Sequence, residues 1–263
     1  SGAMTALHFD SVAISLAGHP VLRGVDFELA EGEVLVLAGR NGVGKTTLLR
    51  IATGILGPDA GEVRIDGRSL ADHSRRELAR VMALVPQETT VPFPFSVAEV
   101  VLMGRAPHLG LLGFESKRDL GIARSAMERL GIDHLADRSI LEVSGGERQL
   151  AMVARALAQE ARILLLDEPT AHLDVSRRLE VLALVRELAR EGRSALVVSH
   201  DLGVAARECD RVALLSEGRI LAVGPPAETL EPDLLRRAFG VESEILRCAD
   251  GSAVVVPRRA PDS

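Results

Sequence analysis

The distribution of hydrophobic residues changes along the chain. Between residues 7 and 38, short segments such as LHFDSVAISL and VDFELAEGEVLVLA alternate apolar with polar positions, which predicts antiparallel strands leading into a buried strand at Val34–Ala38. Two later runs, ARILLLDEPT and SALVVSH, are apolar without alternation, a pattern typical of parallel strands covered on both faces. The pattern therefore indicates an α/β protein.

Helical spacing of apolar residues marks the segments between these strands. A helix is expected at Lys45–Thr53, ending at Gly54, followed by a turn and a short strand in PDAGEVRIDG. The segment RRLEVLALVRELAREG ends at Gly192 and separates the two apolar runs, so it predicts the order strand, helix, strand. Its apolar positions are Leu179, Leu182, Val185 and Leu188.

The middle of the chain differs from both ends. A Pro- and Phe-rich entry, VPFPF, precedes helical stretches with glycine breaks, so we predict a helical insertion at residues 89–150. Two hairpins are expected later, turning at Glu217–Gly218 and Asp250–Gly251. The predicted parts are a core at 4–88 and 151–240, the insertion, a hairpin tail at 241–263, and a residual expression scar at 1–3.

Composition excludes several classes of protein. The chain has 263 residues, 47% of them hydrophobic, which is enough for a substantial core. Its formal net charge of −6, with both signs interspersed, argues against nucleic-acid binding. Cys209 and Cys248 form no CxxC pair, which favours inert thiols in a reducing compartment over a zinc site. No apolar run reaches the roughly 18 residues that span a bilayer, so neither a membrane span nor secretion is expected.

A glycine-rich motif follows the first buried strand. GRNGVGKTT has the spacing G-x-x-x-x-G-K-[ST] between an apolar strand and a helix, and its glycines permit a tight loop whose N–H groups surround a polyphosphate. Lys45 then reaches the β- and γ-phosphates, and the Thr46 hydroxyl is a ligand for Mg²⁺. The candidate nucleotide-binding residues here are Gly39, Asn41, Gly42, Gly44, Lys45, Thr46 and Thr47.

Polar residues follow three other strand-like runs. A nucleotide triphosphatase needs an acid at such a strand end, and we expect Asp167 to hold Mg²⁺, largely through water. Glu168 would orient the attacking water or accept its proton. Gln87 and His200 could reach the γ-phosphate at the same sheet edge, although a strand-end Gln or His alone is more often a surface residue.

A second segment, VSGGERQLAMVARALAQE, has the features of a phosphate site although no lysine lies near it. Ser144 and Glu147 have the spacing of a capping box, which predicts a helix with Ser144 at its N-cap. Gly145 and Gly146 carry no side chain, so an anion can approach the N–H groups of the helix start. A plain interior helix is an equally good interpretation of this segment alone.

Together and in this order, the motifs resemble the ATP-binding-cassette ATPases, and the resemblance covers nearly the whole chain. It implies a P-loop NTPase fold with a mixed central sheet, an N-terminal antiparallel β subdomain and a helical insertion. The family's segments match Walker A at Gly39–Thr46, the Q-loop at Gln87, the signature at Val143–Glu147, Walker B at Ile163–Asp167, the catalytic glutamate at Glu168, the D-loop at Ala171–Asp174 and the switch histidine at His200.

The resemblance also implies a partner for the signature glycines. In the family two subunits pair head to tail, so each ATP lies between the phosphate loop of one chain and the signature helix of the other. The residues Ser144, Gly145, Gly146 and Glu147 would then bind the γ-phosphate held by a partner's Lys45, with Asp174 at the interface. The implied cofactors are ATP and Mg²⁺, the implied metal ligands Thr46, Gln87 and Asp167, and the implied catalytic residues Glu168, His200 and Gln87.

Three positions depart from the family pattern. Val43 replaces a small residue of the phosphate loop, and little effect is expected because that loop binds through backbone N–H groups. The signature begins with Val143 instead of Leu, an apolar exchange expected to be harmless. The position that stacks on adenine in many cassettes corresponds to Leu16, and the chain has no Tyr or Trp. Apolar contact from Leu16 is therefore expected in place of stacking, and His19 is a second candidate.

Residues 92–113, PFPFSVAEVVLMGRAPHLGLLG, are similar to a segment of ATPase subunits from bacterial importers of iron chelates (siderophores), haem and cobalamin, and GRAPH is its most telling part. The C-terminal segment LLRRAFGVESEILRCADGSAVVVP is similar to the same group. The resemblance implies a homodimeric ATPase at the cytoplasmic face of the inner membrane that works with a permease dimer and, indirectly, a substrate-binding protein. The insertion after Gln87 would dock the permease.

Three alternatives stay open. The chain could serve an ABC transporter for another substrate, or it could be a soluble, nucleotide-gated cassette protein of DNA repair or translation. Such soluble proteins usually carry two cassettes or a long coiled coil, and this chain has neither. It could also be a different P-loop enzyme, such as a kinase, in which case Ser144→Arg would not lower ATPase activity.

Overall fold

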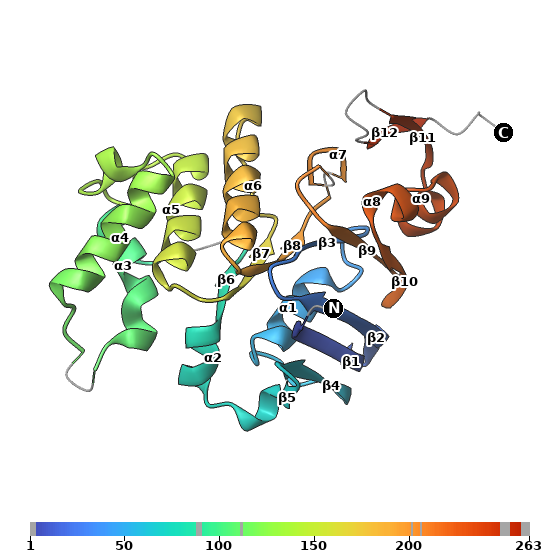
Figure 1. Ribbon diagram of the computed structural model, residues 1–263, viewed down its shortest axis with the longest axis horizontal. Coiled ribbons are helices and arrows are strands. Elements are labelled where there is room, and N and C mark those ends of the chain that lie inside the picture. Colours follow the sequence, from blue (N-terminus) through green and yellow to red (C-terminus); the bar gives the residue numbers. More distant parts are fainter. Residues whose placement is uncertain are drawn as a thin grey trace. The chain divides into compact units, whose positions relative to one another are not determined.

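The computed structural model describes residues 4–87, 91–110, 113–200, 202–205, 207–247 and 253–258. The chain divides into two units, one of residues 1–73 and 185–263 and the other of residues 74–184. The first unit holds most of the strands, and the second holds the helices α2 to α5 (Figure 1).

The first unit contains an antiparallel sheet with the strand order β2-β1-β4-β5. Its strands are β1 (Thr5–Leu16), β2 (His19–Ala30), β4 (Ala60–Ile65) and β5 (Arg68–Ser69), and the 3-10 turn η1 (Leu70–Asp72) follows. Phe9 of β1 pairs with Phe27 of β2, and their buried rings stack with centroids 4.8 Å apart. The alternating sequence therefore formed the predicted antiparallel strands, with its apolar face buried.

The same unit carries strands of a mixed sheet. These are β3 (Val34–Ala38), β8 (Ser194–Val198), β9 (Arg211–Ser216) and β10 (Arg219–Gly224). Strand β3 runs parallel to both β8 and β9, whereas β10 runs antiparallel to β9. All residues of β3 and β8 are buried, as the unbroken apolar runs predict. The predicted α/β fold with a mixed central sheet is confirmed.

Short helices and two hairpins complete the first unit. Helix α1 (Lys45–Ala52) follows β3, and the remaining elements are α7 (Leu202–Ala205), α8 (Pro226–Thr229), α9 (Pro232–Phe239), β11 (Glu242–Arg247) and β12 (Ala253–Arg258). Both predicted hairpins are present, because β10 pairs with β9 and β12 with β11. The first turns at Glu217–Gly218, with φ of 49° and 75°. The predicted turn at Asp250–Gly251, Cys248 and residues 1–3 lie outside the described residues.

The second unit is mainly helical. Its elements are α2 (Arg75–Val81), β6 (Met82–Val85), α3 (Val97–Leu102), the 3-10 helix η2 (Met103–His108), α4 (Lys117–Arg129), the 3-10 turn η3 (Asp133–Leu135), α5 (Gly145–Ala158) and β7 (Ile163–Asp167). Strands β6 and β7 are parallel, and α5 packs against α3 and α4 (Figure 1). Most of the predicted insertion, residues 89–150, lies in these helices, and α6 (Val175–Arg190) continues from this unit into the first.

One of the four apolar residues named for α6 is not buried. Leu182, Val185 and Leu188 are buried, but Leu179 is 47% exposed. Residues three apart in a helix are about 60° out of line, so three such steps place Leu179 roughly opposite Leu188. Val175, one turn before Leu179, is exposed as well.

The helices were compared with the length and apolar character of a membrane-spanning helix. None of the helices in the described ranges combines the length and the apolar character needed to cross a bilayer.

Candidate nucleotide-binding site

The glycine-rich loop joins β3 to α1 in the first unit, and its backbone accepts only glycine at two places. A Cβ added at Gly39 would lie 2.2 Å from the carbonyl oxygen of Leu215. Gly44 has φ of 111°, and a Cβ there would lie 2.7 Å from Cδ2 of Leu22. At Gly42, φ is 78° and an added Cβ would meet nothing within 4 Å. The loop is therefore held close to the neighbouring strands, in a conformation that side chains would prevent.

Lys45 lies against the same loop. Its side chain is only 7% exposed, and its ammonium donates hydrogen bonds to the carbonyl oxygens of Gly39 (2.7 Å) and Arg40 (2.9 Å). These carbonyl oxygens accept hydrogen bonds from the buried ammonium and so reduce the free-energy cost of its burial. The loop thus concentrates positive charge where the motif predicts a phosphate.

The start of α1 differs in its capping from the starts of α2 to α5. No side chain in the described chain caps α1 at Gly44, and its first turn holds no acidic residue. Helices α2, α3, α4 and α5 each begin with a serine that forms a capping box with an acid three residues later. The positive end of a helix dipole favours an anion, so the start of α1, which holds no acidic residue, fits a polyphosphate.

The other predicted residues of the first unit lie at its strand ends or surface. Leu16 ends β1 and is 39% exposed, and the exposed His19 begins β2. His200 lies two residues after the end of β8 and is exposed. Asn41 is exposed, and Thr46 and Thr47 are half-buried.

The two acids lie at the end of β7 in the second unit. Asp167 is 3% exposed and Glu168 is 5% exposed. Glu168 has φ of 51° and His172 has φ of 64°, in the left-handed region that L-residues rarely adopt. Such strained conformations persist where the surrounding structure enforces them, which is common at functional sites. Gln87 follows β6 in the same unit and is exposed.

The predicted capping box at the start of α5 is present. The Ser144 N–H donates to Oε2 of Glu147 (2.8 Å), and the Glu147 N–H donates to Oγ of Ser144 (3.2 Å). The hydrogen bond from the Ser144 backbone, followed by that from its hydroxyl, lowers the pKa of Glu147. Glu147 is therefore held as a carboxylate, which stabilises the helix start.

A hollow of about 630 Å³ opens at this helix start. Ser144, Gly145, Gly146 and Glu147 line it together with His172 and Asp174 of the predicted D-loop. A Cβ added at Gly146 would lie 3.2 Å from the carbonyl oxygen of His172, so the two segments approach closely. Asp174 accepts a hydrogen bond from the backbone of Arg177 (2.9 Å) and so caps the start of α6. His134 and Arg177 also line the hollow, and no sequence motif marks either of them.

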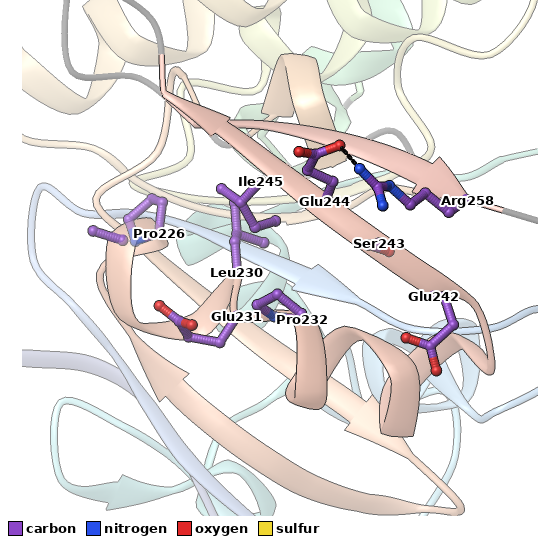
Figure 2. Close-up of a pocket in the computed structure, with 10 residues that line it drawn as sticks. Pro226, Leu230, Glu231, Pro232, Glu242, Ser243, Glu244, Ile245 and Arg258 are labelled. Carbon is purple, nitrogen blue, oxygen red and sulfur yellow. Dashed lines mark hydrogen bonds and ion pairs between the residues drawn. The ribbon is translucent and has the colours of Figure 1, made fainter.

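The described residues were also considered for a metal-ion cluster and for a second hollow. No group of three or more His, Cys, Asp or Glu residues in the described ranges is placed to hold a metal ion. A hollow of about 470 Å³ lies between α8, α9 and the β11–β12 hairpin, and both apolar residues (Pro226, Leu230, Ile245) and glutamates (Glu231, Glu242, Glu244) line it (Figure 2). No residue predicted to bind nucleotide lines it.

The sequence matches the family model described as ABC transporter over residues 22–171. It is 43% identical over 254 residues to the hemin import ATP-binding protein HmuV of Gloeobacter violaceus, covering 94% of this chain and 92% of that protein. It is 46% identical over 249 residues to HmuV of Streptomyces coelicolor, and the match covers 94% of this chain and 88% of that protein. The cobalamin import ATP-binding protein BtuD of Halobacterium salinarum is 40% identical over 246 residues, covering 93% and 61%.

Solved structures agree in fold. An inward-facing ABC transporter of the metal-chelate type superposes with a TM-score of 0.84 at 28% identity, covering 97% of this chain and 98% of that one. A nucleotide-free ATP-binding cassette of an ABC transporter gives a TM-score of 0.79 at 25% identity, covering 88% and 98%.

Proposed function

This chain belongs to the ABC transporter family as an ATP-binding ATPase, and on that premise we propose that it powers import of haem, cobalamin or a related metal chelate through a separate permease. The observation that carries the proposal is the 43% identity to a hemin import ATP-binding protein, which extends over 94% of this chain. The similarity to a metal-chelate type transporter in structure supports the same substrate class.

The phosphate loop would hold the nucleotide. Gly39–Thr47 would surround the phosphates with backbone N–H groups, and the Lys45 ammonium would exchange its carbonyl partners for phosphate oxygens. Mg²⁺ would neutralise charge on the phosphates, held by the Thr46 hydroxyl, Asp167 and Gln87, which are the oxygen donors that this ion prefers. Leu16 would contact the adenine through its exposed apolar side chain.

Hydrolysis would depend on Glu168. Its carboxylate would orient a water molecule and accept a proton as the water oxygen attacks the γ-phosphorus and the bond to the β-phosphate oxygen breaks. Gln87 and His200 would contact the γ-phosphate, so their positions would depend on whether the γ-phosphate is present. The left-handed backbone at Glu168 supports a functional placement, because strain there needs an enforced geometry.

The hollow at the start of α5 would receive the ATP of a second subunit. Ser144, Gly145, Gly146 and Glu147 line it, and Asp174 lies at its rim. Backbone N–H groups at a helix start bind phosphate well, and the two glycines keep side chains out of the way. A head-to-tail homodimer would then bind two ATP molecules, and hydrolysis would release the two chains.

The helices of the second unit would dock the permease. Apolar residues line a hollow of about 440 Å³ between α3 and α4, among them Ala98, Leu102, Leu120 and Met127. Phe93 is 60% exposed and Phe114 is 80% exposed on the same unit, and exposed aromatic side chains are favoured anchors at interfaces. An apolar cytoplasmic segment of a permease dimer fits this surface, which would hold the ATPase at the inner membrane and link it indirectly to a substrate-binding protein.

Uptake by the reconstituted transporter tests this function. The chain is co-expressed and co-purified with a candidate permease, inserted into vesicles, and supplied with haem, cobalamin or a ferric siderophore on the binding-protein side. We expect ATP-dependent uptake of one of these, lost in a Lys45→Ala variant. ATP hydrolysis with uptake of none would point to another transported substrate, and failure to co-purify with any membrane protein would favour a soluble cassette protein.

A further inference from the structure

The GRAPH segment, Gly104–His108, forms most of η2 and lies against the C-terminal end of α5. A Cβ added at Gly104 would lie 2.2 Å from the carbonyl oxygen of Arg155 and 3.3 Å from Cβ of Ala158. The backbone of η2 therefore touches the last turns of α5 directly. Only glycine permits this approach without moving one of the two helices.

The side chain of Arg105 also joins η2 to the C-terminal end of α5. It is 4% exposed, and its guanidinium donates to the carbonyl oxygen of Ala158 (2.7 Å), to Glu160 (2.8 Å) and to Asp119 at the start of α4 (2.9 Å). The last carbonyl groups of a helix have no partner within the helix and carry partial negative charge. Arg105 therefore caps α5 and ties its end to α4 at the same time.

His108 extends this cap by one residue. Its Nε2 lies 2.8 Å from the carbonyl oxygen of Gln159, the C-cap residue of α5. A neutral ring with hydrogen on Nε2, or a charged ring, donates to this oxygen. The two polar side chains of GRAPH thus hold two successive carbonyl groups at one helix end.

Further hydrogen bonds tie η2 to α2, and the end of α5 to α2 and β6. The carbonyl oxygen of Pro107 accepts hydrogen bonds from Arg76 (3.2 Å) and Arg80 (3.0 Å) of α2. The side chain of Gln159 donates to the carbonyl oxygens of Ala79 (2.5 Å) and Met82 (2.7 Å). Helix α5 is therefore joined at its C-terminal end to the strand after which Gln87 follows.

We propose that Gly104–His108 is a positioning clamp on α5 that sets where Ser144, at the opposite end of the helix, presents itself to a phosphate. The inference rests on the proposed function of Ser144 at a dimer interface. A helix of 14 residues is roughly 21 Å long, so a tilt at its clamped end displaces its other end. The carbonyl group of Gln159 lies against His108 of the clamp, and its side chain donates to Met82 of β6, so α5 links the clamp to the strand that precedes Gln87.

Arg105→Lys tests the clamp, because a lysine ammonium lacks the planar fork that serves three acceptors at once. The matched control is Arg118→Lys, the same exchange at an exposed position of α4. Both are made in the Glu168→Gln variant. We expect Arg105→Lys to weaken ATP-dependent dimerisation by about tenfold or more, since small displacements of positioned groups have effects of this size. ATP binding to the monomer should be unchanged, and the control should match its parent.

A purely structural role of Arg105 would reduce the folded fraction and, with it, the number of ATP molecules bound per chain, while leaving the dimerisation constant of the folded chains unchanged. That result would overturn the proposal.

Amide hydrogen exchange along α5 provides a second test of the clamp, and this test does not depend on dimerisation. In Arg105→Lys, exchange should rise at the first turns, near Glu147 and Leu150, as well as at Ala156–Ala158. A rise confined to the C-terminal turns would show that the clamp does not reach Ser144. If the Glu168→Gln parent itself stays monomeric with ATP bound, the dimer proposal fails, and the exchange pattern alone decides the clamp.

Discussion

Gly44 illustrates what can be predicted for a single residue. The motif identifies it as a loop glycine from sequence alone, and the structure adds that its φ of 111° and the nearby side chains of Val21 and Leu22 exclude any Cβ. The crowding comes from β2, more than twenty residues earlier, so local spacing could not reveal it. The motif predicts roles for Lys45 and Thr46, whereas the burial of Lys45 is seen only in the fold.

The capping box of Glu147 makes stability depend on pH. Its pKa is lower in the folded chain than in the unfolded chain, where a glutamate titrates near about 4.3. The capping box therefore makes its full contribution to the free energy of unfolding above the unfolded-state pKa. This contribution is lost as the pH falls through the folded-state pKa. Urea unfolding should show Glu147→Gln less stable than the parent at pH 7, with the difference shrinking below about pH 4. A difference that stays constant with pH would contradict this account.

Cys209 should be unreactive in the native chain. Burial, followed by the neighbouring Asp210 carboxylate, raises the pKa of its thiol to about 12. Since the thiolate is the reactive form, almost none is present at neutral pH. In a Cys248→Ser background, iodoacetamide should label the native chain far more slowly than the urea-unfolded chain. Equal labelling rates in the two states would show that Cys209 is accessible and ionised.

At the scale of elements, the boundaries that could be predicted were those with a local chemical signal. The capping box at Ser144 and the Glu217–Gly218 turn are examples, and both are present. The exposure of Leu179 could not be read from its apolar character alone, because steps of three residues drift around the helix and carry it away from the buried residues. Helix η2 has no helical period and contains Pro107, so its place against α5 could not be predicted.

Two serine variants separate the structural role of a helix cap from its role in the site. Ser144 and Ser74 form the same capping box, with matching distances, at the starts of α5 and α2. Replacing either by alanine should cost roughly 1 kcal/mol of the free energy of unfolding. Only Ser144→Ala should also lower ATPase activity at saturating ATP. Equal loss of activity in both variants would show that Ser144 acts through stability alone.

At the scale of the whole molecule, the family could be identified from the order of the motifs, and relatives at 43% and 46% identity bear it out. The hollow at α5 could not be predicted in full, since His134 and Arg177 join it from segments some forty residues apart. The transported substrate is beyond prediction from these residues, because an ATPase that drives a separate permease does not contact the cargo.

The central claim is that residues of two chains together form each ATP-binding site. Light scattering of the Glu168→Gln variant tests this most directly. Without its proposed base the chain should be monomeric alone and dimeric with ATP and Mg²⁺, because the bound nucleotide is not consumed. Adding Ser144→Arg should return it to a monomer that still binds ATP. A Glu168→Gln chain that stays monomeric with one ATP bound, or a dimer that Ser144→Arg leaves intact, would contradict the claim.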